Sequence, residues 1–174
     1  FRGASYKKGV LLMRNQKVLK IVICAMFAAL ACVATMVIQF PSPMNGYVNL
    51  GDCVVLLGAF ILGPVYGAAA GGIGSMLADI FSGYAHYAPG TLIIKAVMAF
   101  VAAIIFKQLK NKTLSSVLGA VAAEVIMVLG YFAYAGMLLG KGIAAAASIP
   151  GNLVQAAVGI VVSVVLYFAL EKSG

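Results

Sequence analysis

Few side chains in this sequence could do chemistry, and they interrupt segments that are otherwise apolar. Asn152 and Gln155 are three residues apart, so on a helix their amides share one face. Asp79 and Lys95 could pair between neighbouring segments, and Glu124 stands alone in the middle of another. A polar group inside a long apolar helix is costly, so each of these residues calls for a pairing or binding role.

The segments that carry these residues are typical of a membrane protein. Hydrophobic residues make up 64% of the chain and charged residues only 9%, whereas a soluble domain carries about 25% charged residues. The apolar runs are continuous rather than alternating, which favours helices over a β-barrel. We therefore expect an all-α integral membrane protein, a bundle of six transmembrane helices surrounded by a lipid bilayer.

Proline, glycine and charge clusters set the expected boundaries of the six spans. The predicted spans cover residues 18–40, 52–62, 65–81, 90–106, 114–139 and 150–170. The second and third are short and need not cross the bilayer fully. Residues 1–12 are expected to be an upstream extension or a sequence added for expression, and residues 13–174 to form a single membrane domain.

The basic residues are distributed unevenly between the two sides of such a bundle. With the N-terminus inside, ten of them fall on the inner side: Arg2, Lys7, Lys8, Arg14, Lys17, Lys20, Lys107, Lys110, Lys112 and Lys172. Only Lys141 falls in an outer loop. This bias predicts that both termini are cytoplasmic. It also accounts for the net charge of +8 without a nucleic-acid partner.

Most of the polar and aromatic candidates converge on the outer half of the bundle. We predict that they form a pocket for a small solute, with aromatic walls and a few polar anchors. The candidate substrate-binding residues are Asn49, Asp79, Tyr84, His86, Tyr87, Lys95, Glu124, Tyr131, Asn152 and Gln155.

Structural explanations compete with a binding role for several of these residues. Asp79 and Lys95 could simply hold two helices together, and the two roles can coexist. The tyrosines could belong to an interfacial aromatic belt. His86 could be a loop residue without function.

Several catalytic functions lack their sequence signatures. There is no phosphate-binding G-x-x-x-x-G-K-[ST] loop and no H-E-x-x-H motif, and a single histidine cannot build a typical zinc site. No catalytic residue, metal or cofactor is expected. An intramembrane enzyme built on Asp79 and Glu124 would lack a nucleophile, and the two acids lie at different depths. The chain resembles a binding protein that needs a separate energy source; a stand-alone permease is the alternative.

The first span has a smooth face that could pack against another helix. Ala25 and Ala29, and Ala28 and Cys32, have the small-x-x-x-small spacing that allows close helix approach. We expect Ala25, Ala28 and Ala29 to dock a partner subunit. Packing within the bundle is the alternative.

The chain also resembles the substrate-binding S components of energy-coupling factor (ECF) vitamin transporters from about residue 18 to residue 171. The resemblance rests on the alanine-rich first span and on a series of short motifs. These motifs are GYVNLGD at 46–52, LGAFILGP at 57–64, GGIGSMLAD at 71–79, YAHYAPGTLIIK at 84–95 and PGNLVQ at 150–155.

The resemblance implies a function that the residues alone do not give. S components have six helices, capture a vitamin or precursor from outside, and work with a transmembrane T component and two cytoplasmic ABC ATPases. The implied location is a bacterial cell membrane. The loop after the first span would act as a lid, and Asn152 and Gln155 would contribute to the pocket.

Within the family, the sequence is most similar to the branch associated with hydroxymethylpyrimidine or vitamin B6 compounds. Riboflavin-type members often carry a basic residue at the position of Gln155, which weakens a riboflavin assignment and leaves it, or another vitamin, as the alternative. The outer half contains only Lys95 and Lys141 as basic residues, so we expect an unphosphorylated vitamer.

Overall fold

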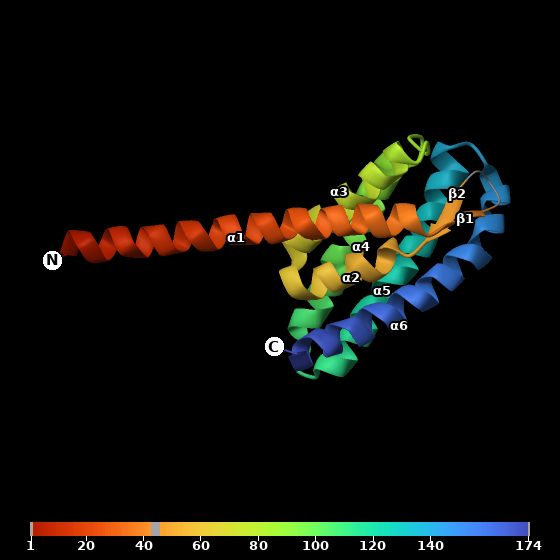
Figure 1. Ribbon diagram of the computed structural model, residues 1–174. Coiled ribbons are helices and arrows are strands. Elements are labelled where there is room, and N and C mark those ends of the chain that lie inside the picture. The colour runs from red at the N-terminus through yellow and green to blue at the C-terminus, as the bar shows by residue number, and fades with distance from the viewer. Residues whose placement is uncertain (1, 43–45, 174) are drawn as a thin grey trace.

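The computed structural model describes residues 2–42 and 46–173, with side chains from residue 16 onward in those ranges. Long helices run side by side, and one short hairpin closes one end of the bundle (Figure 1). The helices are α1 (Arg2–Val37), α2 (Gly51–Leu62), α3 (Pro64–Phe81), α4 (Ala88–Gln108), α5 (Lys112–Ala133) and α6 (Ile149–Ser173). The fold is therefore that of an all-α membrane protein.

Four helical segments among the described residues are long and apolar enough to cross a bilayer. They are Gln16–Val37, Ala88–Gln108, Lys112–Leu138 and Gly142–Ser173. Helix α2 has 12 residues, a length of about 18 Å against a hydrocarbon core of about 30 Å. Helix α3 follows it after a break at Gly63, whose φ of 79° suits a residue without a side chain.

The segment after α1 differs from the expected loop. Strands β1 (Gln39–Ser42) and β2 (Gly46–Asn49) form an antiparallel hairpin in which Gln39 pairs with Asn49 and Phe40 with Val48. Helix α1 ends at Val37, before the predicted boundary at residue 40. Pro41, which indicated a loop, is tolerated here because β1 is an edge strand, where a missing N–H disrupts no further ladder. Pro43 lies outside the described residues.

The connection between α5 and α6 is also more ordered than expected. Helix α5 continues into a π-helical turn, η1 (Tyr134–Leu138), and a 3₁₀ segment, η2 (Gly142–Ser148), replaces the predicted loop. These turns and the β-hairpin lie at one end of the bundle, whereas both chain ends lie toward the opposite end (Figure 1).

Small residues let the helices approach closely in the core. Ala59, Ala99, Ala102 and Ala123 are fully buried among larger side chains. A Cβ atom added to Gly74 of α3 would collide with the backbone of α1 at Ala28. Close packing of this kind drives helix association in a membrane, where lipid removes the hydrophobic driving force.

We predict that Gly74→Ala weakens the contact between α1 and α3. The new methyl group has only backbone in its way, so the expected loss is about 1–3 kcal/mol of unfolding free energy. Thermal unfolding in detergent measures it. The control is Ile73→Ala, at an exposed neighbouring position; equal melting temperatures for the two variants would contradict the proposed packing.

Candidate functional site

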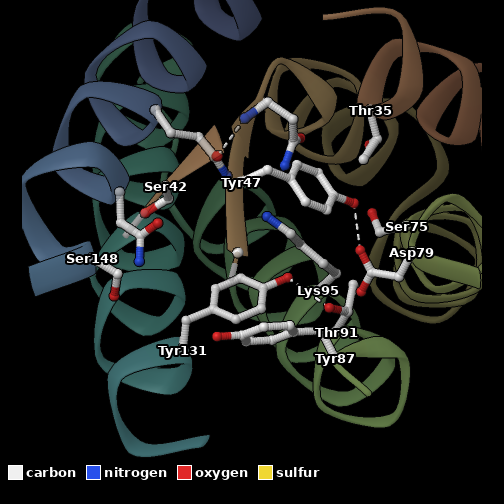
Figure 2. A pocket seen from close by; sticks show the side chains of 14 residues that line it. Thr35, Ser42, Tyr47, Ser75, Asp79, Tyr87, Thr91, Lys95, Tyr131 and Ser148 are labelled. Carbon is white, nitrogen blue, oxygen red and sulfur yellow. Dashed lines mark hydrogen bonds between the residues drawn. The ribbon is translucent and has the colours of Figure 1, made fainter. Parts of the chain in front are cut away.

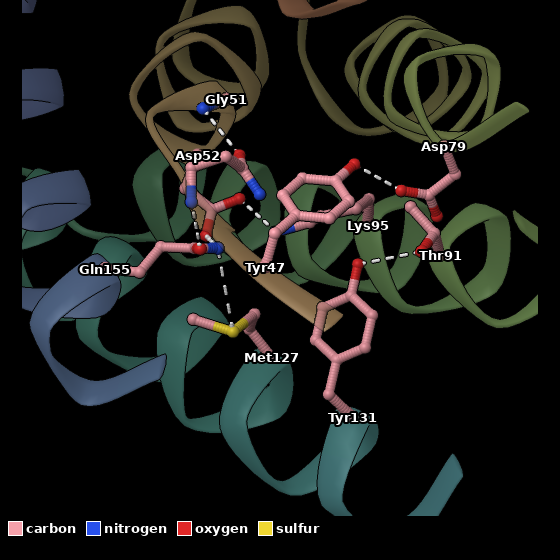
Figure 3. Close-up of polar contacts among 10 residues, drawn as sticks. Tyr47, Gly51, Asp52, Asp79, Thr91, Lys95, Met127, Tyr131 and Gln155 are labelled. Atoms are coloured by element: carbon pink, nitrogen blue, oxygen red, sulfur yellow. Dashed lines mark hydrogen bonds and ion pairs between the residues drawn. The ribbon is translucent and has the colours of Figure 1, made fainter. Parts of the chain in front are cut away.

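A buried ion pair joins two helices beneath the hairpin. The ammonium group of Lys95 on α4 donates to Oδ1 of Asp52, which lies in the first turn of α2 (Figure 3). Their side chains are 2% and 1% exposed. Gln155 on α6 donates from Nε2 to the other carboxylate oxygen, Oδ2, at 2.5 Å. Both oxygens of Asp52 are therefore satisfied, as a buried carboxylate requires.

The same glutamine links this ion pair to the hairpin. Gln155 Oε1 accepts a hydrogen bond from the backbone N–H of Asn49 in β2 at 2.8 Å. Asn49 in turn accepts from the backbone N–H of Gly51 at 2.8 Å through its side-chain oxygen. The hairpin is thus anchored at its base to α6 and to the start of α2.

A second contact ties the hairpin to α3. Tyr47 of β2 donates its hydroxyl to Oδ1 of Asp79 (Figure 3), and Gln39 of β1 donates to Oγ of Ser82 at 2.9 Å. Burial and the adjacent Asp79 carboxylate both raise the pKa of Tyr47 well above its ordinary value. Tyr47 is therefore a neutral phenol that can donate this hydrogen bond at physiological pH.

A pocket lies between these two anchors. Its polar and aromatic lining comes from the hairpin and from α1, α3, α4, α5, η2 and α6 (Figure 2). It is lined by Thr35, Ser42, Gly46, Tyr47, Asn49, Ser75, Asp79, Tyr87, Thr91, Lys95, Tyr131, Ser148, Asn152 and Gln155. With the hairpin in this position the cavity measures about 40 Å³, which is space for a few water molecules. A heterocycle could enter only if the hairpin or the lining side chains moved.

Seven of the ten predicted substrate-binding residues line this pocket. They are Asn49, Asp79, Tyr87, Lys95, Tyr131, Asn152 and Gln155. Lys95 does not pair with Asp79, as considered from the sequence, but with Asp52. Its ammonium group also lies 5.4 Å from the centre of the Tyr131 ring, a cation–π distance.

The other three predicted residues lie outside the pocket lining. Tyr84 packs its ring on Tyr47, 4.6 Å between centroids, and the His86 ring lies 4.8 Å from that of Tyr87. Both therefore stand behind the lining residues. Glu124 on α5 is buried near Asp52, and neither of its oxygens has a hydrogen-bond partner.

Sequence reasoning missed several lining residues that helical spacing could have found. Ser75 is four residues before Asp79 on α3, and Thr91 is four residues before Lys95 on α4. Residues with this spacing share a helix face. The hydroxyl groups of Thr91 and Tyr131 are 3.0 Å apart, so α4 and α5 are also linked beside the pocket.

The predicted docking alanines point in different directions. Ala25 and Ala29 are exposed on α1, and Ala29 borders an apolar groove together with Met26 and Leu30. Ala28 instead lies against Gly74 of α3. Part of the small-residue pattern on α1 is therefore used within the bundle.

Comparison with known proteins decides the family. Residues 15–172 match the family described as the S component of the ECF-type riboflavin transporter. The chain is an S component of an ECF transporter. It is thus a multi-pass membrane protein and a non-catalytic substrate-binding subunit, and membership implies association with an ECF module.

Two individual relatives are similar to most of this chain. The thiamine precursor transporter HmpT of Lactococcus lactis is 30% identical over 165 residues, which cover 94% of each chain. An uncharacterized protein of Pyrococcus woesei is 38% identical over 141 residues, covering 80% of this chain and 93% of the relative.

A solved structure, described as the S component of a bacterial ECF transporter, has a similar fold. It superimposes with a TM-score of 0.74 at 25% identity and covers 90% of this chain and 97% of its own. The helical arrangement of this S component is therefore shared with that experimentally determined protein over nearly its whole length.

We predict that Lys95→Met strongly destabilises this S component. It leaves Asp52 as a buried, unpaired carboxylate, which costs about 3–5 kcal/mol of unfolding free energy. Denaturation in detergent measures the loss, and Lys110→Met at an exposed position is the control. The double variant Asp52→Asn, Lys95→Met should recover part of the stability. No recovery would show that Lys95 does not act mainly through Asp52.

Proposed function

We propose that this S component captures hydroxymethylpyrimidine or a pyridoxine-like vitamer from outside the cell for ATP-driven uptake. The observation that carries the proposal is the small pocket beneath the hairpin, where tyrosine rings surround a few amide, hydroxyl and carboxylate groups. Flat heterocycles stack on such rings, and the polar groups can recognise ring nitrogens and hydroxyls.

The named substrate of one relative supports this substrate class. HmpT, a thiamine precursor transporter, is similar to this chain over 94% of its length. Among the described residues, Lys95 is the only basic residue that lines the pocket, and Asp52 already holds it in an ion pair. A phosphate group would therefore find no free cation there, so the proposed substrate is unphosphorylated.

Riboflavin is the second candidate substrate. The family that matches the chain is named for the riboflavin transporter. However, Gln155 engages both ends of its amide with Asn49 and Asp52, and it takes the position that is often basic in riboflavin-type members. A bulkier tricyclic flavin would also require a larger displacement of the hairpin than a single ring.

The proposed arrangement in the membrane has six helices and cytoplasmic termini. Both chain ends lie toward one end of the bundle and the hairpin lies at the other (Figure 1). The inner side would carry most of the lysine and arginine residues, in agreement with the positive-inside rule. The pocket would then open to the outside.

The proposed partners are a transmembrane T component and two cytoplasmic ABC ATPases. The exposed face of α1 around Ala25 and Ala29 supports a docking role, because small side chains allow close approach of another helix. Without this module the S component would bind substrate but not accumulate it.

Mass spectrometry of small molecules that co-purify with the protein, followed by calorimetric titration, tests the substrate. We expect hydroxymethylpyrimidine or a B6 vitamer to bind and riboflavin to bind more weakly. Asn152→Ala should lower the affinity about 5–10-fold, the effect of one hydrogen bond, whereas Gln108→Ala, at the far end of α4, should leave it unchanged. Preferential binding of a flavin would overturn the proposed substrate.

Reconstitution tests the partners. Uptake into proteoliposomes should require the T component and the ATPases, and Ala25→Trp should reduce uptake while substrate affinity stays constant. Val161→Trp, which also faces outward but lies on α6, is the matched control. Accumulation by the chain alone would favour a stand-alone permease.

A further inference from the structure

The unsatisfied polar atoms of this protein are concentrated at the pocket. Among the described residues, buried side-chain oxygens without a hydrogen-bond partner belong to Thr35, Ser42, Ser75, Asp79 and Glu124. All of these except Glu124 line the pocket. A buried polar group without a partner costs free energy, so these atoms mark where a bound molecule would supply the missing hydrogen bonds.

Two of these residues form one polar edge of the pocket. Ser75 and Asp79 are one helical turn apart on α3, and their side chains lie beside each other on the same side of the pocket (Figure 2). They are only 1% and 3% exposed. Tyr47 occupies Oδ1 of Asp79. Neither Oδ2, which is turned toward Thr91 (Figure 3), nor the hydroxyl of Ser75 has a hydrogen-bond partner.

The chemistry of this edge restricts what can complete it. A carboxylate oxygen accepts hydrogen bonds, whereas a serine hydroxyl can donate or accept them. A ligand group that satisfies both oxygens must therefore offer a donor to Asp79 and either a donor or an acceptor to Ser75. A primary amino group on an aromatic ring has two N–H donors in one plane and can serve both oxygens at once.

The charges around the pocket also favour a hydrogen-bond donor at this edge. Lys95 is neutralised by Asp52, so Asp79 is the pocket carboxylate without a cationic partner among the described residues. A carbonyl oxygen at the same place would set two hydrogen-bond acceptors against each other. A methyl group would leave both oxygens unsatisfied.

We propose that the edge formed by Ser75 and Asp79 binds an exocyclic amino group of the substrate, so that the protein selects an amino-substituted heterocycle. One N–H of that group donates to Oδ2 of Asp79 and the other to Oγ of Ser75. The inference rests on the proposed function and narrows it, because hydroxymethylpyrimidine carries a ring amino group and pyridoxine does not.

A matched pair of ligands tests the selection directly. One is hydroxymethylpyrimidine, and the other is its counterpart in which an oxygen replaces the ring amino group. Calorimetry with the full chain in detergent should give about 10–100-fold tighter binding of the amino compound, the usual effect of a hydrogen bond to a charged group. Equal binding, or a preference for the oxo compound or pyridoxine, overturns the inference and leaves the pyrimidine or B6 function in place.

Substitution of the carboxylate should reverse the preference. In Asp79→Asn the amide oxygen remains the acceptor for Tyr47, and its NH₂ group replaces Oδ2. This variant should lose about 10–100-fold in affinity for the amino compound and gain affinity for the oxo compound. Ser75→Ala should lower the affinity for the amino compound several-fold. The control is Glu171→Gln, at an exposed position near the C-terminus.

The two ligands separate a lost contact from a damaged fold. If Asp79→Asn loses both compounds equally while its melting temperature is unchanged, Asp79 does not read the amino group and the inference is wrong. If the Asp79→Asn variant is unfolded, the Ser75→Ala variant is the deciding test. A loss of affinity for the amino compound alone supports the inference, and an equal loss of affinity for both compounds overturns it. If the wild-type protein binds riboflavin and neither hydroxymethylpyrimidine nor pyridoxine, both the proposed substrate and this inference are wrong.

Discussion

The buried ion pair of Asp52 and Lys95 is the interaction on which the binding end of this protein depends. An ion pair inside a membrane bundle is stable when its two charges neutralise each other and their remaining hydrogen-bonding capacity is used. Gln155 meets that requirement at Asp52. Three helices that are distant in sequence, α2, α4 and α6, are therefore held in one arrangement directly below the pocket.

The hairpin depends on this arrangement at its base and on Asp79 nearer its tip. The backbone N–H of Asn49 donates to Gln155, which is bonded to the ion pair, and the hydroxyl of Tyr47 donates to Asp79 on α3. The hairpin residues that hold the pocket closed are thus bonded to residues that also line it. A molecule that enters the pocket must rearrange or share these bonds, which gives a physical route from substrate binding to hairpin position.

Much of the architecture follows from local rules that a sequence expresses well. Continuous apolar runs predicted the helices, and Gly63 with Pro64 predicted the break between α2 and α3. The hairpin was missed because its strands are four residues each, too short for a period of two to be evident. The amide pair of Asn152 and Gln155 was found because spacing along a helix specifies a shared face.

The sequence by itself determined that this chain lies in lipid as helices and that its few polar groups must have partners, because composition and periodicity are properties of single segments. Only the tertiary structure decided which partner each group takes. Lys95 is 43 residues from Asp52 and Gln155 is 103 residues from it, and no local pattern encodes contacts over such separations. The choice of Asp52 over Asp79 for Lys95 left Asp79 free to face the pocket, and it arises from how the helices pack.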